Sequence, residues 1–169
     1  MPLYGRADPP ASLAAYEGYV ALARSGGRSS NLGWSLGDVS WLKARAGDRR
    51  GALQAARDGL RHDLRSGART NLAGALNRIK LAFVELGDAE PAAVLEGAEA
   101  DGPLVPWSWG DGVPVEQQDR EHALRVLREA LGAEGYERTA AVGAAMTFDE
   151  VVEYTLEQLE RLLAATREG

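Results

Sequence analysis

The chain contains no cysteine, which excludes disulfide bonds and thiolate metal sites. No uninterrupted apolar stretch approaches the length of a membrane-spanning helix, and residues 1–6 lack the apolar core of a signal peptide. We therefore expect a cytoplasmic location and no membrane partner.

The chain also lacks the usual sequence patterns of metal and nucleotide-phosphate sites. His62 and His122 are its two histidines, and they do not form a histidine pair at i, i+4 with a carboxylate helper. Asp101 and Asp111 flank a glycine-rich stretch but lack the spacing of a calcium loop. Nothing in the sequence matches the phosphate-binding pattern Gly-x-x-x-x-Gly-Lys-Ser/Thr. The sequence therefore predicts no metal site and no cofactor.

Charge is divided unevenly between the two halves. Residues 1–80 carry 13 Lys and Arg against 6 Asp and Glu, whereas residues 81–169 carry 6 against 19. Such asymmetry bears on partners and association rather than on the fold. Two interpretations stay open. The halves neutralise each other within one compact body, or oppositely charged ends contact another copy or a neighbouring domain.

The most regular feature is a resemblance of the chain to itself at a shift of 40 residues, which lays residues 27–60 over 67–100. The matched pairs are Gly27 with Gly67, Asn31 with Asn71, Leu32 with Leu72, Leu36 with Leu76, Val39 with Ile79, Gly47-Asp48 with Gly87-Asp88, and Ala52 with Ala92. A fixed period in this range is typical of stacked helical repeats. Such units build surfaces rather than closed active sites, so we expect a binding or scaffolding role.

The spacing of apolar residues predicts an all-α chain. Helices are expected over about residues 9–25, 31–46 and 49–66, each ended by glycine. The clearest stripe has helical steps of 4, 3, 4 and 3 and consists of Leu72, Leu76, Ile79, Phe83 and Leu86. Gly87-Asp88 ends that helix, and Ala92 opens a short fifth one. No strand is expected.

These segments predict one domain. Residues 1–100 form helical repeats, with an orphan first helix followed by the pairs 28–66 and 68–100. Residues 101–116 form a loop rich in proline, glycine and tryptophan, and residues 117–169 form a C-terminal helical cap. Thr147 and Glu150 have the spacing of a capping box that opens the last helix. Its acidic face is a solvated surface or a docking surface and consists of Glu150, Glu153, Glu157 and Glu160.

The paired helices, with Gly-Asp between them and Ala52 or Ala92 early in the second, resemble tetratricopeptide repeats, which are usually about 34 residues long. More narrowly, they resemble the C-terminal helical-repeat region of bacterial signalling ATPases, found in LuxR-type transcription regulators and cyclase-associated predicted ATPases. The match is carried by 75–88 (ALNRIKLAFVELGD), 92–100 (AAVLEGAEA), 122–132 (HALRVLREALG) and 143–156 (GAAMTFDEVVEYTL). Where a small residue is expected late in the second helix, the repeats have Gly59 and Glu99. The resemblance implies a tetratricopeptide-like superhelix of about 40-residue repeats that serves as a sensor or interaction region.

In such arrays the first helix of each pair lines the concave side. Aligning Val39 and Ile79 with the core leucine of that helix turns two tryptophans toward this side. Aromatic and arginine side chains are typical binding anchors. The candidate partner-binding residues are Trp34, Trp41, Arg45, Asn77, Glu85, Trp107 and Trp109. The alternatives are that Trp34 and Trp41 are core residues and that the loop tryptophans plug the repeat stack.

Two further patterns point to other functions. Gly33-Trp34-Ser35-Leu36-Gly37 matches the nucleophile elbow of esterase-like hydrolases, which needs a strand before the serine. Here a helical stripe surrounds the serine, and close helix packing or an open groove is the favoured role for the two glycines. A row of arginines at steps of four has two interpretations. It is a phosphate-binding strip, or it is a solvated face paired with acids such as Glu96 and Glu99. The row consists of Arg57, Arg61, Arg65 and Arg69.

The sequence thus predicts a non-catalytic binding or regulatory module within a larger signalling or transcription regulator. It would hold a protein segment or a small effector in its concave helical face, and nucleic acid is not expected as a partner. A homo-oligomerisation scaffold with oppositely charged ends is the alternative, and an esterase-like hydrolase is a remote one.

Overall fold

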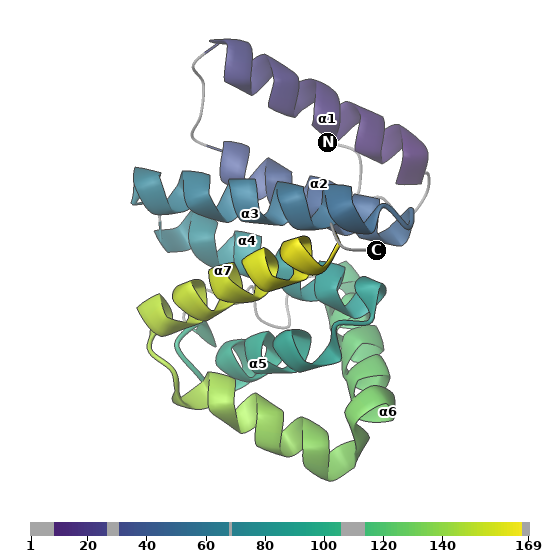
Figure 1. Ribbon diagram of the computed structural model, residues 1–169, viewed down its shortest axis with the longest axis vertical. Helices are drawn as coiled ribbons and strands as arrows, with labels where there is room; N and C mark the ends of the chain where they lie inside the picture. The colour runs from purple at the N-terminus through teal and green to yellow at the C-terminus, as the bar shows by residue number, and fades with distance from the viewer. Residues whose placement is uncertain (1–8, 27–30, 68, 106–113, 167–169) are drawn as a thin grey trace.

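The computed structural model describes residues 9–26, 31–67, 69–105 and 114–166 (Figure 1). This part of the chain forms seven α-helices and no strand, which confirms the all-α class. The helices are α1 (Pro9–Gly26), α2 (Leu32–Arg45), α3 (Arg49–Ser66), α4 (Arg69–Leu86), α5 (Ala89–Ala100), α6 (Pro114–Ala145) and α7 (Phe148–Ala165). Among them, none combines the length and the apolar composition that crossing a membrane requires.

The 40-residue repeat is visible in two equivalent turns, one between α2 and α3 and one between α4 and α5. Gly47 and Gly87 adopt left-handed conformations, with φ of +80° and +79°. In both turns the amide of the following aspartate donates to a carbonyl five residues earlier, at 2.9 Å. Glycine accepts a positive φ without steric cost, which explains why it ends both helices.

The two turns lie against each other through one arginine. Arg49 donates to the carbonyl of Leu86 at 3.0 Å and to the carboxylate of Asp88 at 2.9 Å. The first turn uses its own aspartate differently, because Asp48 caps α3 by accepting from the amide of Gly51 at 2.8 Å. The same sequence position thus caps a helix in one repeat and joins the repeats in the other.

Close approach of helices depends on glycines within them. A Cβ atom added at Gly59 on α3 would lie 2.9 Å from the carbonyl oxygen of Gly33 on α2. A Cβ atom added at Gly74 on α4 would lie 2.8 Å from the ring of Trp34. Gly37 is buried between the same helices. Close packing, rather than an open groove, is therefore the role of these helical glycines.

The predicted stripe of α4 forms the middle of the main hydrophobic core. Its first four residues, Leu72, Leu76, Ile79 and Phe83, have between 0% and 4% of their surface exposed. Burial of such side chains stabilises the fold by about 1.5–3 kcal/mol each. By contrast, α1 lies at one end of the stack in Figure 1 and contributes Val20 and Ala23 to a separate small core shared with α2 and α3.

Helix α6 begins earlier than the sequence predicts, and its second half packs closely on α5. Helix α6 starts at Pro114, inside the predicted loop 101–116, and changes direction at Gly132, whose φ is +70° and ψ is 162°. Beyond this bend α6 lies directly on α5, where a Cβ atom added at Gly97 would be 1.9 Å from the carbonyl oxygen of Ala140. Residues 114–145 are therefore two helices that meet at the non-helical Gly132, and the first of them begins inside the expected loop.

Helix α7 begins at the predicted capping box, in which Thr147 and Glu150 bond each other's backbone amides. It returns to lie beside α3 (Figure 1). Val152 and Leu159 are buried as expected, with 3% and 0% exposure. Leu64 is 42% exposed at the edge where α3 faces α7.

Candidate functional site

The helix face predicted to bind a partner lies largely inside the stack. Trp41 is only 4% exposed, and the guanidinium groups of Arg45 and Arg78 lie 5.3 Å and 5.6 Å from its ring centroid. Trp34 is half-buried and covers Gly74 on the next repeat. These positions give both tryptophans a role in holding α2 against α4.

The remaining predicted residues are more dispersed. Arg45 and Glu85 are exposed near the C-terminal ends of α2 and α4, and Asn77 is half-buried in the middle of α4. Trp107 and Trp109 lie outside the described residues. A partner-binding role for this set stays a prediction, because the structure brings Trp34 and Trp41 to a helix interface rather than to an open surface.

A buried ion pair explains the arrangement around the tryptophans. Arg78 Nε on α4 lies 2.9 Å from Asp38 Oδ1 on α2, with 3% and 4% of the side chains exposed. Burial raises the pKa of Asp38, and the charge of Arg78 with hydrogen bonds from Tyr16 and Trp34 offsets that rise only in part. The pair therefore ties α1, α2 and α4 together and fixes the indole of Trp34.

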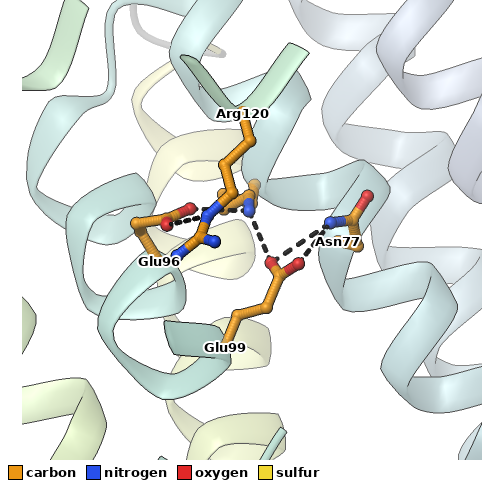
Figure 2. Close-up of polar contacts among 5 residues, drawn as sticks. Asn77, Glu96, Glu99 and Arg120 are labelled. Carbon is orange, nitrogen blue, oxygen red and sulfur yellow. Dashed lines mark hydrogen bonds and ion pairs between the residues drawn. The ribbon is translucent and has the colours of Figure 1, made fainter. Parts of the chain in front are cut away.

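A second polar cluster joins α4, α5 and α6, and Figure 2 shows it. Lys80 Nζ lies 2.7 Å from Glu96 Oε2 and also bonds Glu99. Arg120 Nε lies 2.8 Å from Glu96 Oε1, and Asn77 Nδ2 lies 2.9 Å from Glu99 Oε1. Two cations thus meet two anions, and each carboxylate oxygen accepts a hydrogen bond.

The centre of this cluster is closed to solvent. Lys80 and Glu96 are 1% and 0% exposed. Burial lowers the pKa of Lys80, but the charges of Glu99 and Glu96 outweigh it, so the pKa lies above its ordinary value. The same contacts hold the pKa of Glu99 below its usual range against the opposing effect of burial. Through the contact of Arg120 with Glu96, the cluster fastens α6 to the second repeat.

The structure corrects the expected partners of the arginine row on α3. Glu96 and Glu99, which the sequence offers as those partners, are occupied by Lys80 and Arg120. Arg57 instead pairs with its neighbour Asp58. The acids that face the C-terminal part of the row come from α7, far away in the sequence.

A surface groove of about 700 Å³ lies between the end of α3, the start of α4 and α7. Its apolar lining includes Leu72, Phe148 and Val152, which are 4%, 8% and 3% exposed. Leu64 is 42% exposed and Leu156 is half-buried, so both present apolar surface to solvent. Of the predicted partner-binding residues that the structure describes, none lines this groove.

Two arginines bridge the groove to α7. Arg61 on α3 lies 2.6 Å from Glu160, and Arg69 at the start of α4 lies 3.2 Å from Asp149. The guanidinium of Arg69 also lies 4.9 Å from the ring centroid of Phe148. These contacts lie at the two ends of the groove, and the stretch of α7 between them stays open.

The acidic face of α7 is divided by these contacts. Glu150 belongs to the capping box, and Glu160 pairs with Arg61. Glu153 and Glu157 lie between them, are exposed, line the groove and form no ion pair within the described residues. The sequence left this acidic face open as a solvated surface or as a docking surface. The groove that lies beside it favours the docking surface.

The sequence analysis did not identify Asp63 as a buried acid. Asp63 on α3 is 0% exposed, and neither of its carboxylate oxygens has a hydrogen-bond partner among the described residues. The carboxylate packs on Gly33 at the start of α2, where an added Cβ atom would lie 2.0 Å from it. Burial raises its pKa to about 6. The available signal was its position on the apolar face, three residues after Leu60 and seven after Ala56.

The geometry around Ser35 does not fit a nucleophile elbow. Ser35 is 6% exposed within α2, and residues 32–34 before it are helical rather than extended. His62 and His122 lie on α3 and α6, and His122 contacts Arg125. Among the described residues no three His, Cys, Asp or Glu side chains gather in a way that could hold a metal ion.

Comparisons of the chain with known protein families, with curated proteins and with solved structures found no match. The resemblance to the helical-repeat region of bacterial signalling ATPases therefore stays a prediction. We infer the function of the chain from the geometry of the groove and of the two polar clusters.

Proposed function

We propose that this chain is a tetratricopeptide-like helical-repeat module with a C-terminal cap formed by α6 and α7, and that it binds a protein segment without catalysing a reaction. The groove between α3, α4 and α7 is the observation that carries the proposal. In the cell it would act in the cytoplasm as part of a larger signalling or transcription regulator, as the family resemblance implies.

The repeat geometry supports the architectural part of this proposal. The Gly-Asp turns at residues 47–48 and 87–88 have the same conformation and hydrogen bonding, 40 residues apart. Helices α2 and α4 pack side by side through Trp34 and Gly74. Repeats of this kind bury their inner faces on each other and leave extended outer surfaces for partners.

The location of the site differs from the concave face expected from the sequence. The polar and aromatic side chains of α2 and α4 on that face are used in packing, notably Trp41 and the Asp38–Arg78 pair. Exposed apolar surface is instead found beside α7, at Leu64 and Leu156. Large exposed apolar side chains that gather in a depression are typical of interaction sites.

A peptide-display selection against the intact chain tests this proposal. Hydrogen exchange of the complexes should show protection over the last turns of α3 and over α7. Leu64→Asp should weaken binding at least about tenfold, because it places a charge against apolar surface. Leu22→Asp is the matched control, since Leu22 is 70% exposed on α1, away from the groove. A selection that yields no binder, or protection confined to α2 and α4, would contradict the proposal.

A further inference from the structure

The groove carries two carboxylates that the described chain leaves without a cation. Glu153 and Glu157 are one helical turn apart on α7, and both are exposed and line the groove. Like charges at i, i+4 destabilise an isolated helix by a few tenths of a kcal/mol. The acids on either side differ, because Asp149 pairs with Arg69 and Glu160 pairs with Arg61. The unpaired charge is therefore confined to the open middle of the groove.

Apolar surface faces the same stretch. Leu64 on α3 and Leu156 on α7 line the groove, and Leu64 has 42% of its surface exposed. Below them Leu72 and Val152 are 4% and 3% exposed. The groove thus has an apolar lining and an acidic rim on α7, an arrangement that matches a partner with one apolar and one basic face.

We infer that the groove binds an amphipathic, basic protein helix, with apolar side chains against Leu64 and Leu156 and two Lys or Arg residues, one turn apart, against Glu153 and Glu157. This inference rests on the proposed function and adds the chemistry of the partner. Amphipathic helices commonly bind hydrophobic grooves through anchors at i, i+3, i+4 and i+7.

The length of the groove fits a helix of a few turns. Its lining follows α7 from Phe148 to Glu160, which at 1.5 Å per residue is about 18 Å, or roughly three turns. A helical partner also presents Lys or Arg residues at i, i+4 with the same spacing as the two glutamates. A small cation would pair with the carboxylates but leave the exposed surface of Leu64 uncovered.

The charges also exclude a phosphate-rich partner. Arg61 and Arg69 line the groove, but each is already paired with an acid of α7. Glu153 and Glu157 would repel a phosphate brought between them. Nucleic acids and anionic surfaces bind where unpaired cations gather, whereas here the unpaired groups are carboxylates.

Three synthetic helical peptides of about 14 residues test the inference. They share one leucine face and differ at two positions, i and i+4, which carry Lys, Gln or Glu. Titration of the intact chain should show the Lys peptide binding about tenfold more tightly than the Gln peptide, and the Glu peptide binding most weakly. The advantage of the Lys peptide should shrink when salt is raised from about 50 mM to about 300 mM, because both charges are exposed.

Double variants test whether Glu153 and Glu157 cause the preference for the Lys peptide over the Gln peptide. Glu153→Gln with Glu157→Gln should remove the advantage of the Lys peptide and leave affinity for the Gln peptide unchanged. Glu121→Gln with Glu129→Gln is the control, because it makes the same change in net charge at exposed positions of α6. Leu64→Asp should weaken the Lys and Gln peptides alike.

The outcomes separate the inference from the proposed function. Equal binding of the Lys and Gln peptides, with both lost on Leu64→Asp, overturns the basic partner but leaves the groove as the binding site. Failure of all three peptides overturns the inference, and the display selection then decides the function. Sedimentation of the free chain gives a further outcome, because a dimer abolished by Leu64→Asp would assign the groove to a second copy and overturn the inference.

Discussion

Replacing Asp63 with asparagine is expected to stabilise this protein at neutral pH. Asp63 is fully buried, and within the part of the chain that the structure describes neither carboxylate oxygen has a hydrogen-bond partner. Gly33 makes room for the carboxylate at the start of α2. Burial raises the pKa of Asp63 from 3.8 to about 6, and the nearby charge of His62 opposes that rise only weakly. At neutral pH the folded chain therefore holds an ionised carboxylate without hydrogen bonds.

The size of the expected stabilisation follows from the shift in the pKa of Asp63. Raising the pKa of Asp63 from 3.8 to about 6 corresponds to about 3 kcal/mol of folding free energy when the group is fully ionised. Asparagine keeps the shape and removes the charge, but its buried amide also lacks partners, which costs about 1–3 kcal/mol. A net gain of about 1 kcal/mol, with an upper limit near 2 kcal/mol, is expected at pH 7.

The sign of the pH dependence is fixed by the direction of the shift. Because the pKa of Asp63 is higher in the folded chain, the protonated carboxyl contributes stability that is fully present below pH 3.8 and is lost as pH rises through about 6. Asparagine does not titrate, so the difference between variant and parent should grow between about pH 4 and pH 6 and stay constant above.

Urea unfolding followed by circular dichroism, at about pH 4.5 and about pH 7.5, measures this difference. Asp101→Asn is the control, since Asp101 is exposed after α5 and should shift stability by less than about 0.5 kcal/mol at either pH. A variant at Asp63 whose advantage is the same at both pH values would refute the reasoning. An Asp63→Asn variant that is less stable than the parent chain at the higher pH would refute it too, because the carboxylate would then have a stabilising partner.

The other predictions concern packing and capping and use the same unfolding assay. Lys80→Met leaves the buried Glu96 without its ammonium partner and should cost about 3–5 kcal/mol; a loss below about 1 kcal/mol would show that the cluster is not desolvated. Gly97→Ala should cost about 1–3 kcal/mol, because its Cβ would lie 1.9 Å from a carbonyl oxygen of α6. At Gly135 an added Cβ atom would lie 3.5 Å from its nearest neighbour, so Gly135→Ala should instead stabilise the fold by up to about 1 kcal/mol. Equal effects of the Gly97→Ala and Gly135→Ala substitutions would contradict the close packing of α6 on α5. Thr147→Ala removes one side of the capping box and should cost about 1 kcal/mol, and no change would mean that the box is not formed in solution.

The helices and their turns could be predicted from the sequence because their causes are local. A left-handed glycine at 47 or 87 ends a helix wherever it lies, and the apolar steps of 4 and 3 in residues 72–86 define a buried face without reference to a partner. The capping box at Thr147 likewise depends on four consecutive residues. Each of these features is decided within one or two turns of chain.

The candidate site could not be predicted because its causes are distant. Trp34 and Trp41 have the composition of binding anchors, yet Gly74 and Gly37 let α4 approach so closely that the tryptophans become contacts between repeats. No spacing within α2 records that approach. The groove exists because α7 returns from α6 to α3, where its buried face joins the core and Arg61 meets an acid 99 residues later in the chain.

The buried charges could not be predicted from the sequence either, because their partners are also distant in the chain. Lys80 follows Ile79 on α4 and reads as a surface residue, because an isolated buried lysine would be very costly. Its burial is compensated by Glu96 and Glu99 on α5, and Arg120 on α6 pairs with Glu96, so that two cations face two acids. A sequence shows each of these residues as charged and hence exposed, and only the assembled helices show that together they are neutral.

The uneven charge of the two halves has a structural explanation in these contacts, and it leads back to the groove. Basic residues of the first half meet acids of the second at Arg61–Glu160, Arg69–Asp149 and Lys80–Glu96, which supports neutralisation within one body. The second half nevertheless has a larger excess of acids than the first half has of bases. Part of that surplus lies on α7 beside exposed apolar surface, where it cannot be neutralised from within the described chain. A basic partner at this position would supply the missing positive charge and cover Leu64 with the same helix.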